Sequence, residues 1–600
     1  MTRRFLAGLI GGVCLLGSAT GCGIPDRTEV RVEGPGPAVE GGATSSGRIE
    51  PPSRTAADSP EDFVRNFLAA PAGEPDRAYD RVRQFIEPRD RSGLQEKRGS
   101  EVGLTVVRLT KSPEITPNLD DIDVTITVQQ VGRLRADGVL APPEATETSY
   151  RFRLRPTLES GDQTDWYLAD PPNVLLLSVD ALADHYLPRP VYFWSSDRSR
   201  LVPDQRYLPR AVPEDRRVSE VVKWLTDGPS EWLGRVVSPL PDRTQLINNA
   251  TRTDDRWEVD LDMPGEDRTR VDQLGTQLAW SLSWLDGQLE LKIRNQQGVT
   301  IDLEQRRQAR PLYSVEGTPQ RFCVYEGSIH ALSYPGEPSG PVPVAEAANT
   351  GVVSAALNRA GTGVHAALVV AGANGRKHLS VGSGFPPVSA FARSSGAGWS
   401  TVSRPVWLRS AAPDPPVGLV VADGGLYRFD GRAQVNAVPL GVAGTVTAVA
   451  AALDGHRLAV VVDGVLHVVA VNVDGGVLAT GPARRLPTQL TRLSAVDWYD
   501  ENRLIVAGSA AGRWALYELS VDGALEVTLE QDIGSPATHL AAYPANPRGG
   551  QFGLAMYVAN QVAFRTGRPP ERIQREQVAE VTAPPSGVRP GNPTAPFFLY

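Results

Sequence analysis

Cysteine is scarce in this chain, which has only Cys14, Cys22 and Cys323 among its 600 residues. Cys14 lies in an N-terminal apolar segment that we expect to be removed, and Cys22 lies directly after that segment. Cys323 is then the only free thiol of the mature chain, so no disulfide framework is possible. Its neighbours Phe322 and Val324 are apolar, which predicts a buried filler rather than a reactive nucleophile.

Lysine is rare as well, because almost all of the 61 basic residues are arginine. Lysine and arginine never form a run longer than a pair, and the formal net charge is -8. A phosphate backbone therefore finds no basic stripe to bind. Nucleic acid is not an expected partner.

Clustered metal ligands are also missing from the sequence. The seven histidines are scattered between His185 and His539, with no pair at helical spacing and no cysteine beside them, so we expect no zinc site. Three aspartates between residues 120 and 123 lack the glycine and the distant glutamate of an EF-hand. This pattern favours a solvated turn over a calcium site, and we expect the chain to carry no cofactor.

The common catalytic motifs have no good match. Ser380–Gly384 does not have the spacing of a nucleophile elbow, and Gly372–Lys377 lacks the Lys-Ser/Thr ending of a phosphate loop. We interpret Gly372–Lys377 as a hairpin turn. Asp260 and Asp262 alternate with apolar residues, which predicts that both lie on one solvated face of a strand. We expect no enzymatic activity.

The N-terminus has the three parts of a secretory signal. Arg3 and Arg4 precede an apolar run, Phe5–Leu16, and small residues then lead to Cys22. A permanent membrane helix needs about 20 apolar residues, and this run is shorter. Residues 1–21 are therefore predicted to be a signal peptide.

The residues before Cys22, Ala19-Thr20-Gly21, resemble the bacterial lipobox, although Ala19 stands where that motif most often has leucine. The resemblance implies that Cys22 carries S-diacylglycerol and N-palmitoyl groups. Several acyl chains on one residue anchor a protein durably, here to the extracytoplasmic face of the cell membrane. An ordinary cleaved signal followed by a chance cysteine is the alternative. Residues 22–58, which are poor in large apolar residues, are expected to form a flexible tether.

The length of the chain suggests several domains, since a domain usually has roughly 100 to 200 residues. The first block, residues 59–187, starts with a helix signal at Ser59-Pro60. A second helix is predicted over Asp76–Ile86. Alternating apolar residues then predict half-buried antiparallel strands around residues 102–106, 122–128, 150–154 and 166–168. This block is predicted to be an α+β domain.

The second block covers residues 189–315. An aromatic strand, Val191–Trp194, is followed by a helix with apolar residues at i, i+3, i+4 and i+7 from Val218 to Leu225. Gly228-Pro229 ends this helix, and Trp257–Leu261 forms another strand. This order resembles the GerM domain, a small α/β module of secreted and spore-associated bacterial proteins. The resemblance implies a binding or scaffolding role.

The third block, residues 320–582, contains apolar strand centres that recur about every 40 to 50 residues, as the blades of a β-propeller do. Five blades are visible, and closure of the ring requires a sixth or seventh that uses part of residues 320–350. One or two β-sandwiches are the alternative. Residues 583–600 are rich in proline and glycine and are predicted to be a linker with a docking tip.

The order of lipobox, α+β block, GerM-like block and propeller resembles the actinobacterial lipoprotein family LpqB. That resemblance implies an accessory protein that contacts the extracytoplasmic sensor domain of the histidine kinase MtrB and modulates two-component signalling linked to the cell wall and division. The alternative is a propeller protein that binds or modifies cell-wall glycan. A groove lined by Trp399, Trp407, Trp498 or Trp514 favours glycan binding, whereas the ordinary role of these residues is blade core.

Overall fold

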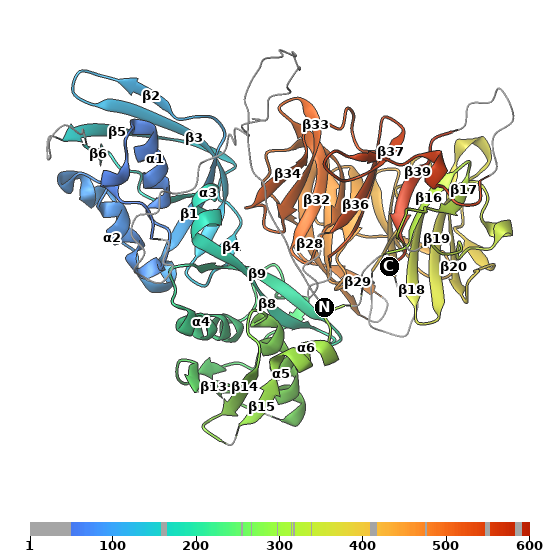
Figure 1. Ribbon diagram of the computed structural model, residues 1–600, viewed down its shortest axis with the longest axis horizontal. Coiled ribbons are helices and arrows are strands. Elements are labelled where there is room, and N and C mark those ends of the chain that lie inside the picture. Colours follow the sequence, from blue (N-terminus) through green and yellow to red (C-terminus); the bar gives the residue numbers. More distant parts are fainter. Residues whose placement is uncertain are drawn as a thin grey trace, which may run out of the picture. The chain divides into compact units, whose positions relative to one another are not determined.

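The computed structural model describes residues 50–600, except for residues 158–164, 254–255, 266, 297, 314, 316–318, 338, 409–416, 475–476, 546–552 and 582–590. Residues Ile49–Tyr600 form one compact unit. It contains an α+β N-terminal domain, a middle α/β domain and an all-β propeller (Figure 1).

The N-terminal domain consists of short helices packed on one curved sheet. Its helical elements are η1 (Arg54–Ala56), α1 (Pro60–Ala69), η2 (Pro75–Arg77), α2 (Ala78–Arg83), η3 (Pro88–Gly93), η4 (Gly99–Glu101) and α3 (Val179–His185). Its strands are β1 (Gly103–Leu109), β2 (Glu114–Pro117), β3 (Ile122–Arg135), β4 (Leu140–Ala141), β5 (Glu147–Thr157), β6 (Asp165–Ala169) and β7 (Leu175–Ser178).

Helix α1 begins where the sequence predicts. The Ser59 hydroxyl accepts a hydrogen bond from the Asp62 backbone N–H at 3.1 Å, and Pro60 occupies the first helical position. The second helix is shorter than predicted, because residues 75–77 form a 3-10 turn and only Ala78–Arg83 is α-helical. The sheet order is β6-β5-β3-β1-β7, with β7 parallel to β1.

The core of the N-terminal domain lies between α1 and the sheet. Phe67 on α1 packs against Phe152 on β5, with 5.7 Å between the ring centroids, and Phe63 packs against Phe85 at 5.5 Å. All four side chains are buried. Burial of one phenylalanine contributes about 1.5–3 kcal/mol, so this aromatic cluster explains why the short helices stay docked.

Two small sheets and three helices make up the described part of the middle domain. Its strands are β8 (Tyr186–Ser195), β9 (Leu201–Pro209), β10 (Val237–Ser238), β11 (Gln245–Leu246), β12 (Thr251–Thr253), β13 (Arg256–Asp262), β14 (Gln288–Ile293) and β15 (Val299–Asp302). Its helices are α4 (Glu214–Asp227), α5 (Arg268–Ser281) and α6 (Leu303–Ala309).

Helix α4 ends at Gly228, whose φ of 92° favours glycine. Strands β13 and β14 are parallel and are joined through α5, as parallel neighbours require.

One prediction for this domain is wrong. Asp260 on β13 is not solvated, because only 6% of its surface is exposed. The segment after β14 covers this carboxylate, which accepts a hydrogen bond from the Asn295 backbone N–H at 3.2 Å. Asp262, two residues further along, remains partly exposed and pairs with Arg294 at 2.7 Å.

The propeller has six blades in the described residues. Blade 1 contains β18 (Val352–Ala360), β19 (Gly363–Ala371), β20 (Lys377–Gly384) and β21 (Phe391–Arg393). Blade 2 contains β22 (Val406–Trp407), β23 (Gly418–Ala422), β24 (Gly425–Phe429) and β25 (Val435–Ala437). Blade 3 contains β26 (Val446–Ala451), β27 (Arg457–Val462), β28 (Val465–Asp474) and β29 (Val477–Thr480), with β30 (Arg484–Arg485) paired to β28.

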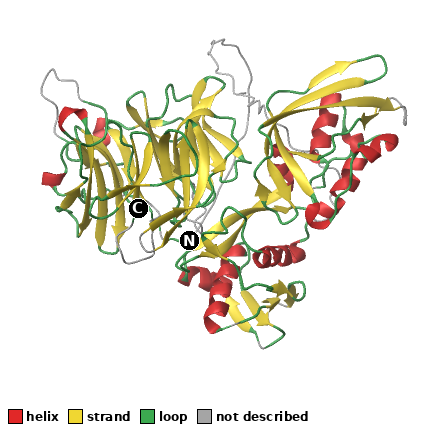
Figure 2. Cartoon of the chain, turned by 180° about the vertical axis from the view of Figure 1, so that it is seen from behind, coloured by secondary structure: helices red, strands yellow, loops and turns green. Residues whose placement is uncertain are grey.

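Blade 4 contains β31 (Thr491–Trp498), β32 (Arg503–Ala510), β33 (Arg513–Ser520) and β34 (Glu526–Glu530). Blade 5 contains β35 (His539–Tyr543), β36 (Leu554–Ala559), β37 (Val562–Arg565) and β38 (Glu571–Arg572). Blade 6 has the order β17 (Ser328–Ala331), β16 (Arg321–Tyr325) and β39 (Thr594–Phe598). Figure 2 shows that strands dominate the propeller, whereas most helices belong to the other two domains.

Strand β39 closes the ring by pairing the C-terminal end of the propeller with its first strand. Thr594 donates its hydroxyl to the Val324 carbonyl at 3.1 Å, and the Phe597 ring stacks on Phe322 with 5.7 Å between centroids. The prediction that residues 583–600 form a linker is therefore wrong for residues 594–598, which belong to the propeller core. The expected sixth blade is confirmed and takes its inner strand from this segment.

Candidate functional site

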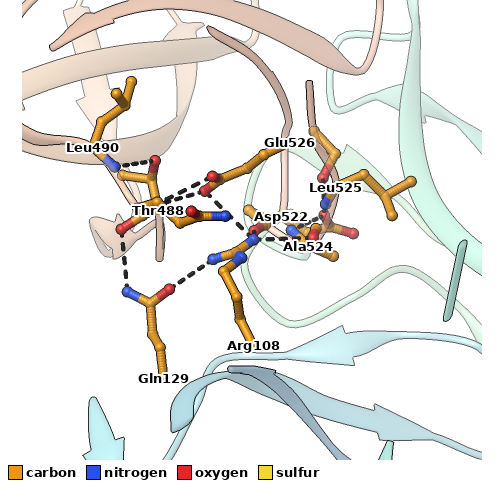
Figure 3. A network of polar contacts seen from close by, with 11 residues as sticks. Arg108, Gln129, Thr488, Leu490, Asp522, Ala524, Leu525 and Glu526 are labelled. Atoms are coloured by element: carbon orange, nitrogen blue, oxygen red, sulfur yellow. Dashed lines mark hydrogen bonds and ion pairs between the residues drawn. The ribbon is translucent and has the colours of Figure 1, made fainter. Parts of the chain in front are cut away.

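A buried polar network joins the N-terminal domain to the propeller (Figure 3). Arg108 on β1 donates hydrogen bonds to the carbonyls of Gly523 and Ala524 at 3.0 and 3.1 Å, and its guanidinium lies 3.4 Å from the Glu526 carboxylate. Only 5% of the Arg108 side chain and 3% of the Glu526 side chain are exposed. A charge buried this deeply needs an opposite charge and hydrogen bonds, and each domain supplies one partner.

Gln129 on β3 extends the same network. Its amide oxygen accepts from Arg108 at 2.6 Å, and its amide nitrogen donates to the Thr488 carbonyl of the propeller at 3.1 Å. Burial raises the pKa of Glu526, and the nearby Arg108 opposes that rise. The network fixes the β1–β3 face of the N-terminal domain against the loop that precedes β34.

The middle domain meets the propeller through a second buried contact. The Tyr192 hydroxyl on β8 donates to the Glu501 carboxylate at 2.9 Å. Arg457 donates to the Glu501 backbone carbonyl at 2.6 Å and to the Asp454 carboxylate at 2.8 Å. Burial raises the pKa of Glu501 to about 8. The carboxyl group is therefore largely protonated at neutral pH.

The middle domain is tied to the N-terminal domain by Arg206. This guanidinium is 1% exposed, pairs with Asp204 at 3.0 Å and donates to the carbonyl of Gly228, at the end of α4, at 2.6 Å. It also donates to the Asp137 carbonyl of the β3–β4 hairpin at 3.3 Å. All three pairs of domains are thus joined by buried charged or phenolic groups.

The axis of the propeller contains a buried ion pair. Arg404 of blade 2 lies 2.7 Å from the carboxylate of Asp497 on β31 of blade 4. The same carboxylate accepts from the backbone N–H groups of Trp498 and Ala542, both at 2.9 Å. Both residues of the pair line a small cavity, together with the aromatic residues Trp407, Trp498, Phe597, Phe598 and Tyr600. The polar groups of these sites are bonded to one another, so they serve to fix blades and domains.

Cys22, the predicted lipidation site, lies outside the described residues, as does the predicted signal peptide. Cys323 is fully buried on β16, as predicted, and burial raises the pKa of its thiol to about 12. A thiol in this state is a poor nucleophile.

Two of the four tryptophans of the glycan alternative, Trp407 and Trp498, line the same small cavity of about 40 Å³, and Trp399 and Trp514 do not line it. Trp407 and Trp498 are 8% and 1% exposed and belong to two blade cores, which confirms the core interpretation for these two. Trp399 packs against Tyr427, with 6.3 Å between ring centroids, and Trp514 lies under the Arg492 guanidinium at 4.9 Å. These last two rings are half-buried.

The remaining candidate motifs have structural roles. Gly372–Lys377 joins β19 to β20 as a hairpin turn, as predicted. Asp121 pairs with Arg153 at 3.3 Å, and Asp123 accepts from Asn118 at 2.6 Å. Within the part of the chain that the structure describes, no three His, Cys, Asp or Glu residues gather as metal ligands, and no helix is long and apolar enough to cross a bilayer.

The buried charges were not predicted from the sequence, although a recognisable pattern of residues surrounds them. Arg108 follows two valines on β1, and Asp497 lies between Val496 and Trp498 on β31. A lone charge within an apolar strand is rarely buried unless it is paired. This pattern identifies one residue of each buried ion pair, Arg108 or Asp497. The residue that pairs with it becomes known only from the fold.

The fold and its buried contacts define a class of protein: a three-domain scaffold with a C-terminal propeller. Three family models match its parts. Residues 53–183 match the N-terminal domain of lipoprotein LpqB, residues 190–305 match the Germane model for sporulation and spore germination, and residues 336–546 match the β-propeller domain of lipoprotein LpqB. The chain belongs to the LpqB family of lipoproteins. None of these descriptions names an enzyme.

Relatives in actinobacteria match over most of the chain. Lipoprotein LpqB of Rhodococcus opacus is 25% identical over 87% of this chain and 88% of its own length. Lipoprotein LpqB of Streptomyces coelicolor is 26% identical over 97% of each chain.

Among solved structures, the tandem GerMN domains of the sporulation protein GerM from Bacillus subtilis match at 13% identity and a TM-score of 0.16. That match covers 20% of this chain and 45% of the other. A nidogen/laminin complex matches at 8% identity and a TM-score of 0.30, over 46% of this chain and 97% of the other.

Proposed function

We propose that this lipoprotein is anchored to the extracytoplasmic face of the cell membrane through acylated Cys22 and binds the sensor domain of a histidine kinase similar to MtrB. The membership of the LpqB family and the residues around Cys22 support the anchor. The proposed role is to modulate two-component signalling linked to the cell wall and division. It depends on recognition and requires no reaction on this chain.

The observation that carries the proposal is that the three domains are joined by buried contacts. Arg108–Glu526, Tyr192–Glu501 and the bond from Arg206 to Asp137 each cross a different domain boundary. Residues 50–600 therefore offer a partner a pre-organised surface to which several domains contribute. A surface held in place before binding loses little entropy when a partner docks.

Binding changes signalling only when it favours one state of the sensor over another. A partner with equal affinity for both states shifts no equilibrium, however tightly it binds. We therefore expect this lipoprotein to bind the signalling and resting conformations of the sensor with different affinities. A tenfold difference corresponds to about 1.4 kcal/mol of conformational bias.

The direct test measures binding of the acylated full chain, purified in detergent, to the isolated outer domain of the kinase. Saturable binding that is absent with the outer domain of an unrelated kinase supports the proposal. The Arg108→Ala variant, which loosens the contact between the N-terminal domain and the propeller, is expected to bind more weakly. Absence of binding across a range of salt concentrations would falsify the partner assignment.

A further inference from the structure

One end of the propeller axis is hollowed into a cavity of about 380 Å³. Residues from five blades line it: Lys377 from blade 1, Thr401–Arg404 from blade 2, Thr445–Val449 from blade 3, Ser494–Val496 from blade 4 and Thr538–Leu540 from blade 5. Thr401, Thr445, Thr447 and Thr538 are exposed. The cavity is therefore open to small solutes.

The lining of the cavity includes Arg404, whose guanidinium pairs with Asp497, a residue that does not line this cavity. Arg404 also lines the second cavity, which the aromatic C-terminal residues close. The hollow is therefore a pocket with a floor rather than an open pore. Its volume lies at the small end of the range for ligand pockets.

Hydroxyl groups form much of the wall. Thr401, Ser403, Thr445, Thr447, Ser494 and Thr538 all line the cavity. The Ser494 hydroxyl oxygen is buried and has no hydrogen-bond partner within the described residues. A ligand in the pocket therefore reaches the exposed threonine side chains and not this buried oxygen.

The charged side chains that line the cavity are basic, although acidic side chains bond to some of the lining residues. Lys377 and Arg404 line it, and no aspartate or glutamate does among the residues that the structure describes, although acidic residues are in excess in the whole chain. Asp423, near the rim, accepts from the backbone N–H of Thr401 at 2.8 Å, and Asp463 accepts from that of Thr445 at 2.9 Å. These carboxylates are held by backbone groups and do not line the pocket.

His539 adds a neutral polar group. Its Nε2 lies 2.8 Å from the Pro596 carbonyl, so this nitrogen carries the proton. Burial lowers the pKa of the ring to about 3, and the ring is uncharged at neutral pH. The cationic groups of the lining are therefore Lys377 and Arg404, and Asp497 offsets the charge of Arg404.

We propose that this pocket binds a small anionic, hydroxyl-bearing molecule, a carboxylated or phosphorylated sugar. The anionic group contacts Lys377 and the Arg404 guanidinium, whose planar set of donors suits oxyanions. The sugar hydroxyls bond to the threonine and serine wall. The volume of the pocket matches one such ring rather than a bare inorganic anion.

Calorimetric titration of the acylated full chain in detergent tests this site. The probes are D-glucuronate and glucose 6-phosphate, with D-glucose and inorganic phosphate as comparisons. We expect one-to-one binding of at least one anionic sugar, weakened severalfold by Lys377→Gln and by Thr447→Val. Lys111→Gln and Thr251→Val, at exposed positions of the other two domains, serve as matched controls and keep the wild-type affinity.

Three results overturn the proposal. The first is that neither anionic sugar binds saturably. The second is that D-glucose or inorganic phosphate binds as tightly as the anionic sugars. The ligand would then not need a sugar ring and an anionic group in the same molecule. The third is unchanged affinity in Lys377→Gln and Thr447→Val, which places the binding elsewhere on the chain.

Discussion

Arg108 on β1 and Glu526 on β34 form an ion pair at 3.4 Å across the boundary between the N-terminal domain and the propeller, and both side chains are almost fully buried. Removal of one partner from such a pair leaves the other charge buried and unpaired, which costs about 3–5 kcal/mol. We predict that Arg108→Ala lowers the stability of residues 50–600 by an amount of this order. Calorimetric unfolding and limited proteolysis at the domain boundary measure the loss.

The controls separate this buried pair from an ordinary surface pair. Arg65 pairs with Asp62 while 73% of its side chain is exposed, so Arg65→Ala is expected to cost less than about 0.5 kcal/mol. The double variant Arg108→Ala, Glu526→Gln removes the unpaired charge and should recover part of the loss. Equal losses in Arg108→Ala and Arg65→Ala contradict the prediction.

Glu501 predicts a pH dependence of stability. Its pKa is raised from 4.5 to about 8 by burial, near Asp500 and Asp454 and with Arg457 opposing the rise. Between these two pH values the unfolded chain loses the Glu501 proton while the folded chain keeps it. Stability therefore falls as pH rises through this window, by up to about 1.4 kcal/mol per pH unit, and this group adds no further change above it.

Glu501→Gln isolates this contribution, because glutamine cannot ionise and still accepts a hydrogen bond from Tyr192. The unfolding free energy of the variant, relative to the wild type, should increase from pH 4.5 to about pH 8. Glu101→Gln, at an exposed position, should keep the wild-type profile. The same profile in Glu501→Gln and the wild type shows that this carboxyl group does not carry the effect.

Local periodicity was sufficient to predict most elements of the fold. Ser59 begins α1, Gly228 ends α4, and the alternating residues of β3 and β5 lie in the N-terminal sheet. These features depend on residues close together in the chain, where spacing determines which face is apolar. The recurrent strands of the propeller are also local, so the blades could be recognised.

Contacts between distant residues could not be predicted in the same way. Arg108 bonds to Gly523, 415 positions further along, and Thr594 bonds to Val324, 270 positions before it. Proline and glycine before residue 594 suggested a linker, whereas Phe597 and Phe598 supply the inner strand of blade 6. The pairing of β39 with β16 determined the structure of this segment, although its local composition favoured a linker.

Closure of the ring by β39 predicts that the propeller is sensitive to changes at its C-terminus. Phe597 is 1% exposed and stacks on Phe322, so Phe597→Ala is expected to cost about 3–5 kcal/mol. Val527, with 52% exposure, provides a control, and Val527→Ala should cost less than about 0.5 kcal/mol. Chemical denaturation followed by the buried tryptophans measures both variants. A loss in Phe597→Ala as small as in the control means that β39 does not close the ring.

The last prediction concerns the anchor and uses the two cysteines that remain outside the apolar N-terminal run. Cys22→Ala removes the proposed acylation site and should move the protein from the membrane fraction to the soluble fraction, because the acyl chains supply the membrane affinity. Cys323→Ala removes a thiol that is buried on β16 and should leave the protein in the membrane fraction. Mass spectrometry of the N-terminal peptide identifies the lipid. A Cys22→Ala protein that remains membrane-bound, or an unmodified N-terminus in the wild type, excludes anchoring at this residue.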